Sequence, residues 1–237
     1  MEKSKTLVRS LFKKLTKIHI YSTALPAGYI PTKLVVSESG DTNANQPAII
    51  TIPSRLAGQP PDPDGHSQWI VNGSTKNKVL NAPGYPQRVP KSPGGKAYEI
   101  KSTPTMGMGV FATRDIPMCG VVFAERPLIV SPAALTLSTN LNPKDYSLAD
   151  YTKIVLFERE QQLEAAAGRM EPERRANLMA LMNSHTEDGS GPIGGIVRTN
   201  GYQVGNLRDG EDYHYSVLCD VGSRINHRCG FTIYLLE

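Results

Sequence analysis

The sequence has few cysteines and no long apolar run. Its three cysteines, Cys119, Cys219 and Cys229, include no Cys-x-x-Cys pair, so they predict neither a disulfide framework nor a zinc site. No metal site is therefore expected. No apolar run reaches the roughly 18–20 residues that span a bilayer, so no membrane span is predicted. An odd and sparse set of cysteines is typical of a reducing compartment, which predicts an intracellular protein, nuclear or cytoplasmic.

Acidic residues are scarce at the N-terminus. Six lysines and arginines stand there against Glu2 alone, so residues 1–20 carry +5, and the net charge of +4 leaves −1 for the rest of the chain. Because the body has no basic face, no specific nucleic-acid binding is predicted. Apolar residues recur at helical spacing in residues 1–21, which form a basic amphipathic tail. A plain helix, a mitochondrial presequence and a nuclear import or anionic-surface signal all fit this tail.

Residues 22–96 contain eleven of the eighteen prolines. Proline lacks the N–H that helices and sheets require, so the segment is expected to be a linker or a disordered arm. The short β-prone run 48–52 and the single Trp69 are its only candidates for docking on a domain. The stretch 62–66, which ends in His66, is either a metal loop or a solvated turn, and its Pro-Asp and Asp-Gly pairs favour the turn.

Residues 97–237 have the pattern of an α+β domain. Strands are expected near 98–100, 120–124 and 126–130, and again at 195–200 and 215–219. A helical block occupies about 147–185. Its first helix begins at the capping residue Ser147 and ends near Gly168, and Pro172 opens a second helix. The order of strands, helices and further strands predicts one domain with an inserted helical block.

Two short segments stand out as candidate sites. Gly107-x-Gly109 on its own is typical of a tight hairpin turn, and it lacks the context of a Rossmann fingerprint or a P-loop. The segment 223–229 contains Asn226, His227 and Cys229. Taken alone, it is compatible with core packing, a thiol next to a base, or a ligand site, although catalytic Cys and His normally lie far apart in sequence.

Together the segments resemble the SET family, in particular fungal SET-domain proteins. The stretch 107–116 matches the opening Gly-x-Gly-Val-Phe-Ala-Thr-Arg-Asp-Ile, and 125–128 matches the Glu-Arg-Pro-Leu that follows. The stretch 169–200 looks like the helical insert and the strand after it. The most diagnostic motif, Arg-x-Asn-His-Ser-Cys-x-Pro-Asn, is matched at Arg224, Asn226, His227 and Cys229. The resemblance covers residues 98–229.

The resemblance implies a fold of small curved β-sheets around a knotted C-terminus, and the activity of an S-adenosylmethionine-dependent protein-lysine N-methyltransferase. Its substrate would be a protein lysine that enters a narrow channel, sheds a proton and aligns with the methyl group. The residues expected to bind S-adenosylmethionine are Met108, Gly109, Val110, Asn226 and His227, with Ser223 and Asn200 as weaker candidates.

The sequence departs from the family after Cys229. Arg228 replaces the usual serine, and Phe231-Thr232 replaces Pro-Asn. Tyr234 lies too close to the motif to match the catalytic tyrosine, so no catalytic residue is assigned. The post-SET zinc cluster is also missing, and Cys229 is interpreted as a small buried thiol. We therefore expect a SET domain that is incomplete at its C-terminus, with a non-catalytic SET-like fragment or protein-interaction module as the alternative.

Overall fold

The computed structural model describes residues 25–31, 47–55, 58, 60–134, 141–205 and 214–226. Over these residues the chain has an α+β architecture, with four α-helices and two small sheets. The predicted fold class is thereby confirmed at this level. The N-terminal tail and the residues from His227 onward lie outside the described residues.

The main sheet has five strands in the order β1-β2-β5-β7-β6. Only the β2–β5 pair is parallel, with Trp69 opposite Val130, and the other neighbours are antiparallel. Strand β5 is buried along its whole length. It lies between β2, which precedes it in the sequence, and β7, which follows it. The strands are β1 (Pro47–Ile52), β2 (Ser67–Asn72), β5 (Ile129–Pro132), β6 (Tyr202–Val204) and β7 (Tyr215–Leu218).

The segment 22–96, expected to be a linker or disordered arm, instead contributes two strands of the main sheet and a helix. Strands β1 and β2 pair over six residues each, and α2 (Gly73–Leu80) follows directly, capped by the Asn72 side chain. The prolines do not prevent this, because they lie in the connections or at the first residue of β1, an edge strand that tolerates proline. The ordered domain therefore begins well before Ala97.

The helical block follows the predicted boundaries. Helix α3 (Leu148–Ala167) begins after Ser147, whose hydroxyl accepts the Asp150 N–H at 3.1 Å, and α4 (Pro172–Met179) has Pro172 in its first turn. Gly168 ends α3, but its φ of −63° is right-handed, so glycine is not required there for a left-handed cap. Two short 3-10 turns complete the elements, η1 (Pro143–Asp145) and η2 (Gly222–Arg224).

Two expected strands are absent from the structure. The stretch expected as a strand at 195–200 is instead part of helix α5 (Pro192–Asn200). The buried Glu160 of α3 accepts the N–H groups of Ile193 and Gly194 at 2.9 and 2.6 Å, so the helix is capped from a distant element. The strand expected at 120–124 is an irregular connection, and the strand expected at 126–130 begins only at Ile129, as β5.

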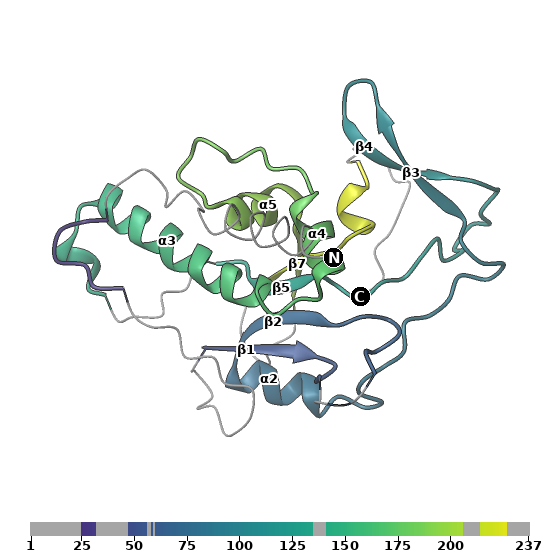
Figure 1. Cartoon of the computed structure of the whole chain (residues 1–237), viewed down its shortest axis with the longest axis horizontal. Helices are drawn as coiled ribbons and strands as arrows, with labels where there is room; N and C mark the ends of the chain where they lie inside the picture. Colours follow the sequence, from purple (N-terminus) through teal and green to yellow (C-terminus); the bar gives the residue numbers. More distant parts are fainter. Residues whose placement is uncertain are drawn as a thin grey trace, which may run out of the picture.

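Apolar side chains cover both faces of the main sheet. Helices α3 and α5 pack on one face, where Leu163 is fully buried, and α2 packs on the other, where the Tyr215 hydroxyl donates to Thr75 at 2.9 Å (Figure 1). A sheet covered on both faces explains why all four residues of β5 are buried, rather than every second one. Within the described residues, no helix is both long enough and apolar enough to cross a membrane.

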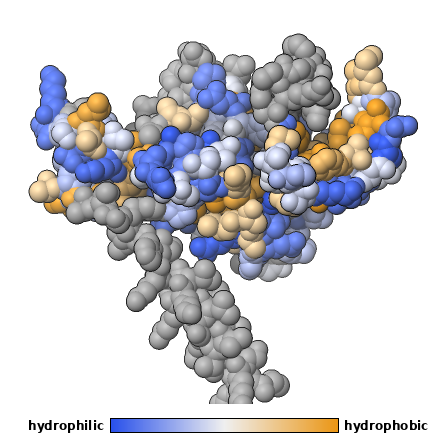
Figure 2. Space-filling model, turned by 90° about the horizontal axis from the view of Figure 1, so that it is seen from above, coloured by the Kyte–Doolittle hydropathy of each residue, from blue (hydrophilic) through white to orange (hydrophobic). Residues whose placement is uncertain are grey.

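The second sheet is a hairpin that projects from the main body. It consists of β3 (Tyr98–Thr103) and β4 (Gly107–Ala112), and it lies at the upper right of Figure 1, beside η2. The Tyr98 ring contacts Phe123 with centroids 5.1 Å apart, which fixes the base of the hairpin. Orange side chains gather at this end of the molecule in Figure 2. The exposed apolar residues of the hairpin and the following loop are Met106, Met108, Phe111, Met118 and Val121.

The contribution of the core can be tested with two leucines of α3. Leu163 has no exposed surface, whereas Leu148 is 83% exposed. Leu163→Ala should lower the free energy of unfolding by about 2–5 kcal/mol, because it leaves a cavity between α3 and the sheet. Leu148→Ala should change it by less than about 0.5 kcal/mol. Urea denaturation followed by circular dichroism measures both, and equal effects would contradict the described packing.

Candidate functional site

The two motifs that stand out in the sequence meet in the structure. A Cβ placed on Gly109 would lie 3.0 Å from Nδ2 of Asn226, and 3.1 Å from the Phe111 ring. Contacts between β4 and η2 confirm that the hairpin lies against the turn that precedes Asn226. A larger residue at position 109 would fit tightly, and the Asn226 side chain would have to shift to make room for it.

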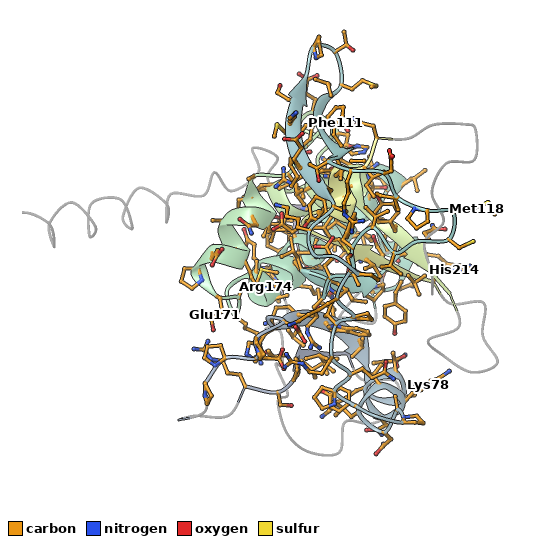
Figure 3. The ribbon with its side chains drawn as sticks, turned by 90° about the vertical axis from the view of Figure 1, so that its right-hand side faces the viewer. Lys78, Phe111, Met118, Glu171, Arg174 and His214 are labelled. Atoms are coloured by element: carbon orange, nitrogen blue, oxygen red, sulfur yellow. The ribbon has the colours of Figure 1, made fainter. Side chains whose placement is uncertain are left out.

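The predicted residues of β4 present a mixed surface. Gly109 is buried, Val110 is half-buried and Met108 is 45% exposed. Because side chains alternate along a strand, Met108 and Val110 lie on the face opposite to Gly109 and Phe111. The exposed Asn226 and the partly exposed Phe111 ring therefore lie beside the buried backbone of Gly109. Figure 3 shows Phe111 on the hairpin, at the end of the molecule opposite Lys78 of α2.

The weaker candidates have structural partners. The Asn200 amide donates to the carbonyl oxygens of Met182 at 2.6 Å and Ile196 at 2.8 Å, so its side chain is committed to the end of α5. The Ser223 hydroxyl accepts the N–H of Cys219 at 3.0 Å and donates to the Asn200 carbonyl at 3.1 Å. These two residues support the turn and do not present free polar groups there. His227 and Cys229 lie outside the described residues.

Sequence reasoning missed the residue that holds this turn. The Glu125 carboxylate accepts three consecutive backbone N–H groups, from Asp220 and Val221 at 3.1 Å and from Gly222 at 2.6 Å. Burial raises the pKa of Glu125 above its ordinary value, although the three hydrogen bonds oppose the shift. Its position within the stretch 125–128 was the only sequence signal, and no local pattern connects it with residues 220–222.

Two further side chains close the turn from other elements. The Tyr202 hydroxyl of β6 donates to the Gly222 carbonyl, and the Asn177 amide of α4 donates to the Asp220 carboxylate at 2.7 Å. Burial, followed by the neighbouring Cys219 and Glu125, raises the pKa of Tyr202. Strand β6, helix α4 and the loop containing Glu125 therefore all converge on residues 219–226.

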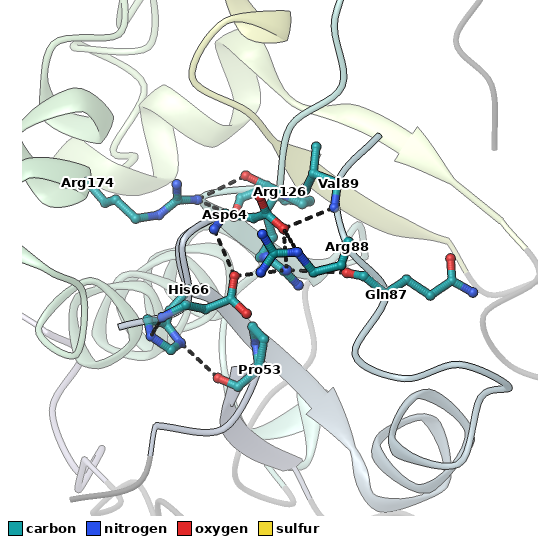
Figure 4. Close-up of polar contacts among 10 residues, drawn as sticks. Pro53, Asp64, His66, Gln87, Arg88, Val89, Arg126 and Arg174 are labelled. Atoms are coloured by element: carbon teal, nitrogen blue, oxygen red, sulfur yellow. Dashed lines mark hydrogen bonds and ion pairs between the residues drawn. The ribbon is translucent and has the colours of Figure 1, made fainter. Parts of the chain in front are cut away.

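The expected turn around His66 proves to be a buried polar cluster (Figure 4). His66 Nδ1 lies 2.9 Å from the Pro53 carbonyl and Nε2 accepts the Asp62 N–H at 3.1 Å, so both ring nitrogens are used. Arg126, which is 9% exposed, pairs with Asp62 at 3.3 Å. Arg174 of α4 donates to the carbonyl oxygen of Arg126 at 2.9 Å. Both ring nitrogens thus have protein partners, and His66 is buried rather than solvated. Among the described residues, no group of three or more His, Cys, Asp or Glu side chains could hold a metal ion.

The geometry offers recognition groups rather than a complete catalytic set. An exposed carboxamide and a partly exposed aromatic ring can bind a planar, polar ligand through hydrogen bonds and ring contacts. No nucleophile paired with a base is present at this place in the described part of the chain. No family model, curated protein or solved structure matches the chain. The resemblance to the SET family therefore depends on the motifs themselves.

The contact between Gly109 and Asn226 can be measured by a double-mutant cycle. Gly109→Ala should destabilise the protein in the native background, because its methyl group displaces the Asn226 amide. The same change should cost less when Asn226 is already alanine. A coupling energy of about 0.5–3 kcal/mol is expected from urea denaturation of the four proteins. Strict additivity would show that the two residues do not touch.

Cysteine labelling tests the burial of the turn. Burial, followed by the nearby Glu125, raises the pKa of the Cys219 thiol to about 12, so at pH 8 only about one molecule in ten thousand carries the thiolate. Cys119 is exposed. Iodoacetamide at pH 8 should modify Cys119 in the folded protein and reach Cys219 only after unfolding in urea. Peptide mapping by mass spectrometry distinguishes the sites, and rapid labelling of folded Cys219 would contradict the described packing.

Proposed function

We propose that this chain is a SET-type protein that binds S-adenosylmethionine and belongs to the protein-lysine N-methyltransferases. The observation that supports the proposal most strongly is the contact of Gly109 with Asn226. The two motifs lie in distant parts of the sequence. A random coincidence of motifs gives no reason for them to lie in contact.

The absence of a side chain at Gly109 fits the way in which the family binds its cofactor. A Cβ at position 109 would meet the Asn226 amide at 3.0 Å and the Phe111 ring at 3.1 Å, so glycine lets both side chains lie close to the strand. Backbone groups of Met108, Gly109 and Val110 would hold one side of S-adenosylmethionine, and Asn226 with His227 the other. The bound molecule supplies an electrophilic methyl group. The role of the protein is to align a desolvated, neutral lysine of a protein substrate with that methyl group.

The second candidate function is a non-catalytic SET-like module that binds another protein. The exposed apolar side chains of the hairpin region favour it, since Met118 is 95% exposed and Met106 59% exposed. Flexible methionines are common on surfaces that accommodate varied partners. This function would use the same end of the molecule without transferring a methyl group. Either function places the protein inside the cell with a protein partner, and neither needs nucleic acid.

Isothermal titration with S-adenosylmethionine tests the proposal. Saturable binding is expected, and Asn226→Ala should weaken it by about tenfold or more, because it removes a hydrogen-bonding group from a desolvated ligand. Gly109→Val should abolish binding, because its side chain would push the Asn226 amide and the Phe111 ring out of place. Asn77→Ala is the matched control, since Asn77 is an exposed asparagine on α2, far from the hairpin.

The same proteins distinguish an enzyme from a module. Transfer of a radiolabelled methyl group to a mixed protein extract, lost in Asn226→Ala and kept in Asn77→Ala, supports the enzyme. Binding of S-adenosylmethionine without transfer supports the module. An absence of any binding by the native chain contradicts the proposal in both forms.

A further inference from the structure

The turn that carries Asn226 has little support of its own. Residues 219–226 contain only one short 3-10 turn, closed by hydrogen bonds from Arg224 N to Val221 O and from Ile225 N to Gly222 O, both at 3.0 Å. The three N–H groups that precede these bonds, at residues 220–222, have their partners on Glu125. The conformation of the turn therefore depends on a side chain from another part of the chain.

Glu125 lies in a loop that is anchored on both sides. On its C-terminal side, Arg126 is paired with Asp62 at 3.3 Å, and β5 begins three residues later. On its N-terminal side, the Ser92 hydroxyl donates to the Val122 carbonyl at 2.8 Å, and Phe123 contacts the Tyr98 ring of the hairpin. The carboxylate is thus presented from a fixed position between the hairpin and the main sheet.

We infer that Glu125 is a positioning residue, which holds the turn at residues 220–222 and thereby places Asn226 against Gly109. It acts through backbone N–H groups and does not itself touch a ligand. The inference rests on the proposed function only in so far as Asn226 is used for binding. The claim about the position of Asn226 stands on the geometry alone.

Both carboxylate oxygens are needed for this role. Oε1 accepts the Gly222 N–H, and Oε2 accepts the N–H groups of Asp220 and Val221. An amide in place of the carboxylate would direct an NH₂ group at one of these donors. Glu125→Gln should therefore keep some of the three hydrogen bonds to residues 220–222, whereas Glu125→Ala should lose all three. A residue needed only to fill space would not distinguish the glutamate from its near-isosteric amide.

Other charged and titratable groups surround the Glu125 carboxylate. Asp220 lies close enough to raise the pKa of Glu125, and Arg174 is the neighbouring cation. The Asp220 carboxylate is itself occupied, by Asn177 at 2.7 Å and by Arg224 at 3.4 Å. The titratable groups Cys219, Tyr98 and Tyr202 also face Glu125, and their pKa values are raised in part by its charge. Backbone N–H donors are thus the direct partners of Glu125 in the described structure.

Amide hydrogen exchange and NMR of the whole chain test the inference. In Glu125→Ala the amides of residues 220–222 should exchange at least about tenfold faster than in the native protein, and the resonances of Gly109 and of the Asn226 side chain should shift. Glu125→Gln should give an intermediate result and, if the alanine variant does not fold, carries the test alone. The exposed Glu187, changed to glutamine, is the matched control and should alter none of these signals.

Binding of S-adenosylmethionine gives the second readout. Glu125→Ala should weaken it about tenfold or more, and in the Asn226→Ala background the same change should add little, because the group that it positions is already gone. Fast-exchanging amides in Glu125→Ala with unmoved Gly109 and Asn226 resonances would overturn the inference, as would fully additive losses of affinity. If the native chain does not bind S-adenosylmethionine, the proposed function fails, and the exchange and NMR results still decide whether Glu125 positions Asn226.

Discussion

The structure depends on the insertion of β5 between β2 and β7. Both neighbours are far from β5 in the sequence, and Glu125 and Arg126, shortly before the strand, bind to segments beside these neighbours. Arg126 pairs with Asp62, ahead of β2, and Glu125 holds residues 220–222, after β7. One short stretch therefore joins the early and late parts of the chain. A charged pair buried at this point also excludes other registers of β5, since a shift would leave its partners unsatisfied.

The candidate site follows from the same arrangement. The hairpin of β3 and β4 lies outside the main sheet, so its position is set by the loop that leads into β5 and by the turn beyond β7. Gly109 reaches Asn226 because these two connections are fixed to one another through Glu125. The candidate site is thus assembled from two anchored connections, although neither half belongs to the sheet that forms the core.

Buried or half-buried charged side chains satisfy distant backbone groups in three places. Glu160 of α3 caps α5, Glu125 holds the turn after β7, and Arg159 of α3 donates to the Pro132 carbonyl at 2.5 Å, at the end of β5. Each contact fills a backbone hydrogen-bonding need that the local sequence leaves open. Leaving such a group unpaired in the interior costs about 1–3 kcal/mol, so these three residues specify the fold as well as stabilise it.

Features whose causes are local can be predicted from the residues alone. Ser147 and Pro172 define helix starts through bonds and backbone angles within a few residues, and 215–218 forms β7 as predicted. The sequence also singled out Gly109 and Asn226, although only the fold brings them into contact. Other elements depend on contacts between distant segments. Residues 192–200 become a helix because Glu160 reaches their N–H groups, and β1 and β2 form within a proline-rich segment because they pair with each other and with β5. Hydrogen bonds between segments far apart in the sequence leave no periodic pattern in either segment, so residues such as Glu125 become visible only once the chain is folded.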